Sequence, residues 1–364
     1  MRYEPYACLD ELIAPEALAR LSGEPIRSVD HRPFVGGHSA SGSAFVALVT
    51  NGGSGPRFVV KRSSLACDWI VRATGDTAGR EVQVWANGLL DELPQEITHP
   101  VLACAREGDG WAILMRDVSD ALTPGTDAVC DAPLGAHDHD RHLDAMAALH
   151  ATFWESPRLS DPALGLCSPW HLYTSLSAET ASREAGHPNR VVAEIRGGWA
   201  LLPTLIDPDL AALLARLAVD PGPLCAALAR FPQTLVHGDP RAANIGIEPG
   251  PPRRLVLLDW HFVGPSVPAT DLAWYLDDNG HRLPMPLEES IARYRDRLRE
   301  RLGPRSAGWD WQAQLDLALL GQLVRGAWAP AWHVVHNENP VIRERLRAHL
   351  DRWVASARAG AARL

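Results

Sequence analysis

One stretch, residues 234–260, constrains the chain most because it places two acids and an amide at a fixed spacing. It reads TLVHGDPRAANIGI and, after a turn, LVLLDW. Asp239 follows a short apolar run, Asn244 stands five residues later, and Asp259 ends a second apolar run. Short apolar runs that end in polar turns are typical of strands followed by loops. We therefore expect a loop that carries Asp239 and Asn244, and then a hairpin that presents Asp259.

This spacing brings together the groups that phosphoryl transfer requires. The reaction needs an acid that positions the attacking hydroxyl, and oxygen ligands that hold magnesium against the phosphates. Asp239 would orient the hydroxyl or accept its proton, while Asn244 and Asp259 would bind the cation. The step from Asp239 to Asn244 matches the kinase catalytic loop, with Gly238 in place of arginine. The alternative is a turn rich in Asp and Asn that only caps local structure.

With these motifs the chain resembles the aminoglycoside phosphotransferase and choline kinase-like family, small-molecule relatives of the protein kinases. That family has H-G-D-x-x-x-x-N, then a strand that ends in D-W, then G and D-L-A. Here stand His237–Asn244, Asp259–Trp260, Gly264 and Asp271–Ala273. His261 departs from the pattern, because an acid or amide commonly follows D-W in that family. The departure concerns the acceptor side, where we expect contacts from His261.

The resemblance implies an α+β, protein kinase-like fold with two lobes. The N-terminal lobe, residues 1–116, would bind the nucleotide with an antiparallel sheet and one main helix. The C-terminal lobe, residues 117–364, would be mainly helical, carry the catalytic residues and bind the acceptor. The resemblance also implies Mg²⁺ as cofactor and ATP or GTP as phosphoryl donor. Asp271 and His237 would brace the catalytic loop.

A glycine-rich segment, GGHSASG at residues 36–42, precedes the apolar run 44–49 and predicts two strands joined by a turn. Glycine allows the backbone to approach phosphates and offer N–H groups to them. Glycine-rich hairpins are also common where no ligand binds. The residues that we assign to nucleotide binding in this turn are Gly37, Ser39, Ser41 and Gly42.

A lysine and a glutamate follow in the order that a kinase would need. Lys61 ends a predicted strand at residues 58–61, and Glu81 borders the apolar face of a predicted helix at 78–90. In kinases such a lysine holds the α- and β-phosphates and pairs with a glutamate on the next helix. The alternative is an ordinary surface lysine and a surface glutamate.

A hairpin signal at residues 101–105 and 111–115 leads into the segment between the two expected lobes. In the resembled family, backbone groups of this linker bind the adenine. The residues assigned to that contact are Met115, Arg116 and Val118.

The C-terminal part has helical periodicity over 287–302, over 311–335 with a kink expected at Pro330, and over 341–357. Arg241 lies next to Pro240 in the catalytic loop and would face the transferred phosphate or the acceptor; the alternative is a structural ion pair. Trp328 and Trp332 recur at near-helical spacing and would line an acceptor pocket, although most tryptophans belong to cores.

Residues 119–140 are expected to form a loop that ends at a helix over 141–154. This loop contains His137 and His139, and His142 follows it directly. We interpret these histidines as solvated rather than metal-binding, because no second ligand cluster completes a site.

Composition narrows the class of protein. A chain of 364 residues that is 46% hydrophobic can bury a substantial core and is long enough for two lobes. The net charge of −9 and the lack of a basic run argue against nucleic acid or an anionic membrane as partner. The six cysteines are scattered singly, so neither a zinc cluster nor a disulfide framework is indicated. No stretch approaches the length of a membrane span, and we expect a cytoplasmic protein.

We therefore predict an ATP- or GTP-dependent phosphotransferase that acts on a hydroxyl of a small molecule. The acceptor would be an antibiotic such as an aminoglycoside, or a metabolite such as an amino alcohol, sugar or nucleoside. A catalytically idle nucleotide-binding protein of the same fold is disfavoured because the expected polar residues are all present. A protein kinase is disfavoured because only 12 residues separate Asp259 from Asp271, which leaves no room for a long activation loop.

Overall fold

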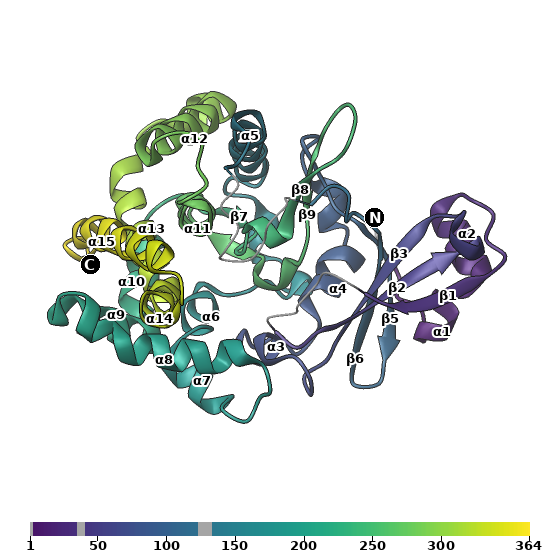
Figure 1. Ribbon diagram of the computed structural model, residues 1–364. Coiled ribbons are helices and arrows are strands. Elements are labelled where there is room, and N and C mark those ends of the chain that lie inside the picture. The colour runs from purple at the N-terminus through teal and green to yellow at the C-terminus, as the bar shows by residue number, and fades with distance from the viewer. Residues whose placement is uncertain (1–2, 35–40, 123–132) are drawn as a thin grey trace.

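The computed structural model describes residues 3–34, 41–122 and 133–364. An antiparallel sheet near the N-terminus faces a C-terminal part that is mainly helical (Figure 1). The sheet has five strands in the order β1-β2-β3-β6-β5. These strands are Val29–Pro33 (β1), Ala44–Thr50 (β2), Arg57–Ser63 (β3), Val101–Glu107 (β5) and Gly110–Arg116 (β6).

Strand β3 lies at the centre of this sheet and carries Lys61. Residues 58–61 are all buried, so both faces of β3 are covered. The hairpin between β5 and β6 turns at Gly108, whose φ of 56° favours a residue without a Cβ. The central position of β3 holds Lys61 on a rigid element.

The N-terminal part has short helices, and Asp76 binds the backbone at the start of α4. The carboxylate of Asp76 accepts hydrogen bonds from the N–H groups of Gly79 and Arg80, both at 2.9 Å from Oδ1. We predicted one helix over 78–90, but α4 ends at Ala86 because Gly88 follows in a left-handed conformation with φ 75°. The helices of this part are Leu9–Leu12 (α1), Pro15–Ser22 (α2), Trp69–Ala73 (α3) and Arg80–Ala86 (α4).

The C-terminal part is built around α13, which is buried at every residue except Gln312 and packs against α15 and α11. Its sequence, WQAQLDLALLGQLVRG, is apolar on most sides, as a fully buried helix requires. The helices here are Ala136–Thr152 (α5), Pro169–Thr174 (α6), Ala178–Arg183 (α7), Arg190–Leu205 (α8), Pro208–Val219 (α9), Gly222–Leu228 (α10), Ala269–Asn279 (α11), Leu287–Leu302 (α12), Trp311–Gly326 (α13), Trp328–His336 (α14) and Pro340–Ala361 (α15).

Short strands lie between the large sheet and these helices and position the loops that join them (Figure 1). β4 pairs in parallel with β9, so a segment that follows α4 is attached to the C-terminal part. The short strands are Ile97–Thr98 (β4), Thr234–Val236 (β7), Ile245–Ile247 (β8), Leu255–Leu257 (β9) and Gly264–Ser266 (β10). The 3₁₀ helices are Asn51–Gly53 (η1), Leu89–Glu92 (η2), Pro157–Ser160 (η3), Pro162–Leu164 (η4), Ala242–Asn244 (η5), Trp260–Phe262 (η6) and Gly303–Ser306 (η7).

Two further local predictions were wrong, and the first concerns the histidines. Helix α5 begins at Ala136 and contains His139 and His142, which are buried rather than solvated. Their Nδ1 atoms contact the hydroxyl of Tyr275 at 2.8 and 3.1 Å, and Nε2 of His139 contacts Ser290 at 3.0 Å. Burial of an imidazole is tolerated when such hydrogen bonds satisfy it.

The second correction concerns the helix predicted over 311–335. It breaks at Ala327, between α13 and α14, rather than at Pro330. A proline has no N–H to donate to the residue four positions earlier, and its ring clashes with that carbonyl. The break therefore falls before the proline, and Pro330 lies in the first turn of α14.

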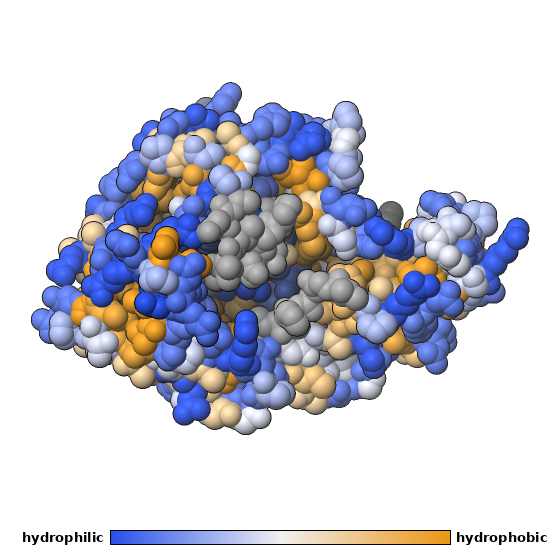
Figure 2. Space-filling model, in the orientation of Figure 1, coloured by the Kyte–Doolittle hydropathy of each residue, from blue (hydrophilic) through white to orange (hydrophobic). Residues whose placement is uncertain are grey.

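Most of the face shown in Figure 2 is hydrophilic, with hydrophobic residues in scattered patches. Among the helices of the described residues, no single one is long and apolar enough to cross a membrane. Helices α9 and α10 reach that length and composition only together, and the chain bends by 84° between them.

Packing of α14 against α8 gives a prediction about stability. A Cβ added to Gly198 of α8 would lie 2.1 Å from the carbonyl oxygen of Trp328. Gly198→Ala should therefore lower the free energy of unfolding by about 1–3 kcal/mol, measured by urea denaturation. Gly186→Ala is the control, because a Cβ there meets no atom within 4 Å. Equal stability of the two variants would contradict this account of the packing.

Candidate active site

The loop that follows β7 is held by the carboxylate of Asp271, at the start of α11. Asp271 is fully buried and accepts hydrogen bonds from the backbone N–H groups of His237 at 2.7 Å and Gly238 at 2.8 Å. Nε2 of His150 lies 3.2 Å from the same carboxylate. Burial alone raises the pKa of Asp271, but these hydrogen bonds and the nearby histidines lower it overall. The predicted bracing role of Asp271 fits these contacts.

Gly238 is required at its position by both backbone geometry and space. Its φ is 80°, and a Cβ there would lie 2.5 Å from the carbonyl oxygen of Phe262. A side chain would therefore push the loop away from η6.

The carboxylate of Asp239 is buried and oriented by two donors. Nε1 of Trp274 donates to Oδ1 at 2.7 Å, and Nδ2 of Asn244 donates to Oδ2 at 2.8 Å. Nε of Arg241 lies 3.4 Å from Oδ2 and forms an ion pair with it. Each carboxylate oxygen accepts two hydrogen bonds, so the orientation leaves capacity for a hydroxyl. This fixed orientation of the Asp239 carboxylate suits a base that must face the hydroxyl from which it accepts a proton.

Sequence reasoning missed two residues of this site, Trp274 and Arg325. Nη1 of Arg325 donates to the carbonyl oxygen of Gly238, and the guanidinium stacks on the ring of Trp274 at 3.8 Å. Burial lowers the pKa of Arg325 to about 10, which leaves it charged at neutral pH. One signal was available for each: Trp274 lies three residues after Asp271 on the same helix face, and Arg325 is the one basic residue of α13.

Asp259 is linked to the catalytic loop through its neighbour Leu258. The N–H of Leu258 donates to the carbonyl oxygen of Asn244 at 2.9 Å. The carbonyl oxygen of Leu258 lies 2.8 Å from Nε2 of His237. Asp259 then adopts a left-handed conformation, with φ 62°, which turns the chain away from β9. The segments that carry Asp239 and Asp259 are thus hydrogen-bonded to each other.

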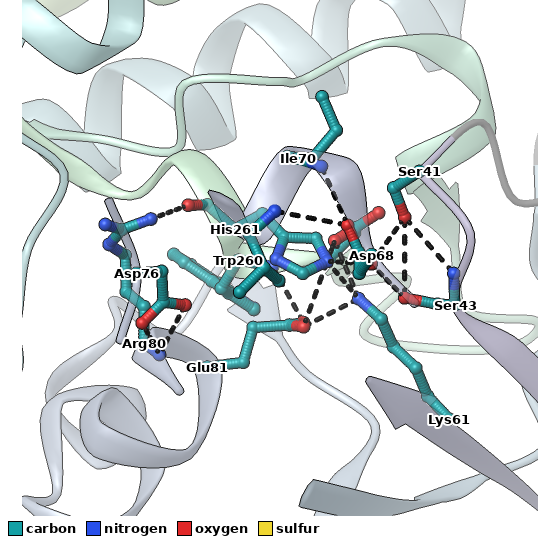
Figure 3. A network of polar contacts seen from close by, with 12 residues as sticks. Ser41, Ser43, Lys61, Asp68, Ile70, Asp76, Arg80, Glu81, Trp260 and His261 are labelled. Atoms are coloured by element: carbon teal, nitrogen blue, oxygen red, sulfur yellow. Dashed lines mark hydrogen bonds and ion pairs between the residues drawn. The ribbon is translucent and has the colours of Figure 1, made fainter. Parts of the chain in front are cut away.

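Lys61 meets Glu81 and Asp259 in the interior, and all three were predicted to belong to one site. Nζ of Lys61 lies 2.6 Å from Oε2 of Glu81 and 2.8 Å from Oδ1 of Asp259. Figure 3 shows Lys61 and Glu81 pointing toward each other with His261 beside both. Burial lowers the pKa of Lys61, but the two carboxylates raise it by more. The pKa of Lys61 is therefore above its usual value. For Asp259, burial raises the pKa, but the charge of Lys61 and its hydrogen bond lower it overall.

His261 does not lie where we predicted. We expected an acceptor contact, but the imidazole is buried, with its Nε2 3.0 Å from Nζ of Lys61. It reaches this position because η6 begins directly after Asp259 and returns toward α4. His261 therefore belongs to a buried cluster with Lys61, Glu81 and Asp259, which we call the lysine cluster.

The described part of the glycine-rich segment is attached to α3. The hydroxyl of Ser41 donates to Oδ2 of Asp68 at 2.7 Å. Oδ1 of Asp68 caps α3 by accepting from the N–H groups of Ile70 and Val71. A Cβ on Gly42 would lie 2.3 Å from the carbonyl oxygen of Cys67. A role for Ser41 and Gly42 in nucleotide binding stays a prediction, and Gly37 and Ser39 lie outside the described residues.

The predicted linker residues follow the end of β6. Nη2 of Arg116 donates to Glu248 at 2.8 Å, which ties the end of the sheet to the loop after β8. Met115 pairs with Val59 in the sheet, and Val118 is buried. Their contact with an adenine stays a prediction, as does a boundary between the lobes after Arg116.

Trp328 and Trp332 take part in the packing of α14 against α8. A Cβ on Gly197 would lie 2.3 Å from the ring of Trp332, and this ring stacks on His336 at 3.6 Å between centroids. An acceptor contact of the two tryptophans stays a prediction.

The residues present fit a magnesium ion in their donor chemistry. Asp259 and Asn244 supply carboxylate and amide oxygens, the ligands that Mg²⁺ prefers. Because Nδ2 of Asn244 donates to Asp239, its Oδ1 is directed away from that carboxylate. Glu81, Asp259 and His261 also offer ligand atoms within 4.8 Å of one another, but the ammonium of Lys61 contacts all three. The cation of that cluster is therefore the lysine.

Comparison with known proteins gives one family and several structures. A model of the family described as "Phosphotransferase enzyme family" matches residues 39–313. The chain is similar in structure to an ethanolamine kinase from Plasmodium vivax, with 12% identity and a TM-score of 0.52, over 90% of this chain and 82% of that one. This similarity confirms the predicted fold. No curated protein matches the sequence.

Two further structures have TM-scores below 0.5, and we draw nothing more from them. A choline kinase from Streptococcus pneumoniae is 14% identical, with a TM-score of 0.46, over 95% of this chain and 99% of that one. An aminoglycoside phosphotransferase from Streptomyces rimosus, solved with ADP and streptomycin, is 18% identical, with a TM-score of 0.41, over 94% and 98% of the two chains.

The buried carboxylate of Asp271 gives a prediction about stability and pH. Asp271→Asn replaces one acceptor by an amide N–H that faces backbone donors, so it should cost about 1–3 kcal/mol of unfolding free energy at pH 7. Because the folded-state pKa of Asp271 is lowered, the ionised carboxylate stabilises the fold above the unfolded pKa of about 4. This stabilisation is lost as the pH falls through the folded pKa.

Urea denaturation of both proteins between pH 3 and 7 checks this expectation. The difference between them should be largest at neutral pH and shrink in acid. A difference that is constant with pH would mean that the charge of Asp271 does not brace the loop.

Proposed function

Because the chain belongs to the phosphotransferase enzyme family, we propose that it transfers the γ-phosphoryl group of ATP or GTP to a hydroxyl of a small molecule. Asp239 acts as the base that orients the hydroxyl and accepts its proton. Asn244 and Asp259 would hold Mg²⁺, which when bound neutralises charge on the phosphates. Lys61, fixed by Glu81, contacts the phosphates.

One observation carries this proposal: Leu258 is hydrogen-bonded on both sides to the catalytic loop. Its N–H reaches Asn244 and its carbonyl reaches His237, while the next residue, Asp259, contacts Lys61. Three segments far apart in sequence therefore supply a base, two oxygen ligands and a cation to one place. A turn that only caps local structure would not require Lys61 or Glu81 to approach it.

The charge around Asp239 supports an acceptor that carries an amine. Asp278, near the end of α11, accepts the N–H of Ala242 at 2.9 Å and lies close to Asp239. The side chain of Asp278 is exposed to solvent, while Arg241 is a cation beside Asp239. The exposed carboxylate of Asp278 gives a cationic amine a partner near Asp239, which favours aminoglycosides and amino alcohols over neutral sugars and nucleosides.

A screen of hydroxylated amines, neutral sugars and nucleosides tests the proposal directly. Each compound is incubated with the protein and Mg–ATP or Mg–GTP, and products are identified by the mass increase of one phosphoryl group. We expect amines to be phosphorylated. Products from neutral compounds alone would contradict the amine preference. Nucleotide binding without transfer or hydrolysis would support the catalytically idle alternative.

Replacement of Asp239 and replacement of Asp259 should have different effects on nucleotide binding and on transfer. Asp259→Ala removes a magnesium ligand, so it should weaken Mg–nucleotide binding and abolish both transfer and slow hydrolysis of bound nucleotide. Asp239→Asn keeps the shape but cannot accept a proton, so Mg–nucleotide affinity should persist while transfer falls by about 10²–10⁴-fold. Calorimetric titration with Mg–nucleotide, followed by the transfer assay, separates the two roles.

Two results would overturn the assignment of Asp239. One is a loss of nucleotide affinity in Asp239→Asn as large as in Asp259→Ala. The other is near-normal transfer by Asp239→Asn.

A further inference from the structure

His261 adds an imidazole to the lysine cluster, where the reaction proposed above gives it no part. Its Nε2 lies 3.0 Å from Nζ of Lys61 and 3.3 Å from Oδ1 of Asp259. Oε2 of Glu81 is 3.5 Å away. The residue is 4% exposed, so water does not replace these contacts. The imidazole is the one uncharged acceptor that is available to Lys61 within the described part of the chain.

A count of hydrogens shows what the imidazole does. An ammonium has three hydrogens and no lone pair, and Nζ of Lys61 has three partners: Glu81, Asp259 and His261. Nε2 of His261 must therefore accept, and its hydrogen lies on Nδ1. Nδ1 has no hydrogen-bond partner among residues 3–34, 41–122 and 133–364. The only polar contact that the ring makes as an acceptor is thus the one to Lys61.

The backbone around His261 is fixed to α4 from two directions. The N–H of Trp260 donates to Oε1 of Glu81 at 3.1 Å, and the carbonyl oxygen of His261 accepts from Nη1 of Arg80. Glu81 therefore binds Lys61 with one oxygen and η6 with the other. Figure 3 shows these contacts converging on one small region. These two contacts fix the backbone from which the imidazole extends toward Lys61.

We propose that His261 is a positioning residue that holds the ammonium of Lys61 when Asp259 turns from the lysine to the metal. The inference rests on the proposed function. In that reaction Lys61 would keep Glu81 and His261, and its third hydrogen would be available to a phosphate oxygen. Without the imidazole, one hydrogen of a buried ammonium has no acceptor, unless Lys61 retains Asp259 and competes with the metal for it.

Two substitutions of similar polarity separate this role from simple packing. The side-chain oxygen of glutamine reaches about as far from Cα as Nε2 of histidine, whereas that of asparagine reaches only as far as Nδ1. His261→Gln therefore restores an acceptor for Lys61. His261→Asn places its amide where the native ring has no partner, and so serves as the matched control.

The experiment is a calorimetric titration of Mg–ATP into the wild type, His261→Gln, His261→Asn and His261→Ala, with thermal unfolding to verify the fold. Loss of a hydrogen bond to a buried charge should raise Kd by about 10–100-fold in the Asn and Ala variants. The Gln variant should bind at least about tenfold more tightly than the Asn variant. With an acceptor from the screen, the nucleotide KM should rise in the Asn and Ala variants while the acceptor KM stays unchanged.

The outcomes distinguish this inference from the function on which it rests. If the wild type does not bind Mg–ATP or Mg–GTP, the proposed function fails. If the wild type binds and the folded Asn and Ala variants bind as well as it does, only the role of His261 is wrong. Equal losses in the Gln and Asn variants would likewise overturn it, because packing alone would then explain the effect.

Discussion

The buried ammonium of Lys61 is the interaction on which the arrangement of this molecule depends. It lies on the central strand of the sheet and contacts Glu81 of α4 and Asp259 beyond β9. A charge taken out of water at such a place is strongly unfavourable unless its partners have good geometry. Removal of one partner from a buried pair costs about 3–5 kcal/mol. The ion cluster therefore ties the sheet, α4 and the C-terminal part into one relative position.

A second buried charge, Asp271, performs the corresponding task within the C-terminal part. Its two hydrogen bonds to the catalytic loop set the direction of the backbone just before Asp239. Arg325 of α13 also holds the loop, through the carbonyl oxygen of Gly238. Every residue of α13 except Gln312 is buried, so this arginine extends from a helix in the core. The position of Asp239 is thus set by contacts of its loop with α11 and α13.

An ion pair also joins the two parts of the molecule. Arg72 of α3 binds Glu184, at the end of α7, through two hydrogen bonds, with Nε at 2.8 Å from Oε1. This pairing lowers the pKa of Glu184 below its usual value. A bidentate contact of this kind fixes orientation as well as distance. It places the helices that precede the catalytic loop against the end of the glycine-rich segment.

Local sequence was sufficient for features whose cause is local. Periodicity predicted α12 at residues 287–302, because the buried face of an amphipathic helix is visible in its own residues. The order of motifs likewise placed Lys61, Glu81, Asp239, Asn244 and Asp259 in one site. These residue types were predicted from the groups that phosphoryl transfer requires, which are the same for every acceptor.

Only the folded chain revealed features whose cause lies elsewhere in the sequence. The burial of His139 depends on a hydroxyl that is 136 residues away, and Arg325 approaches Gly238 across 87 residues. His261 was assigned to the acceptor from its neighbours in sequence, but its partner is Lys61, 200 residues earlier. The pattern of residues along a segment indicates which chemistry that segment can perform. Which side chain satisfies a buried polar group is decided by packing, because the partner comes from whichever element the core brings into contact.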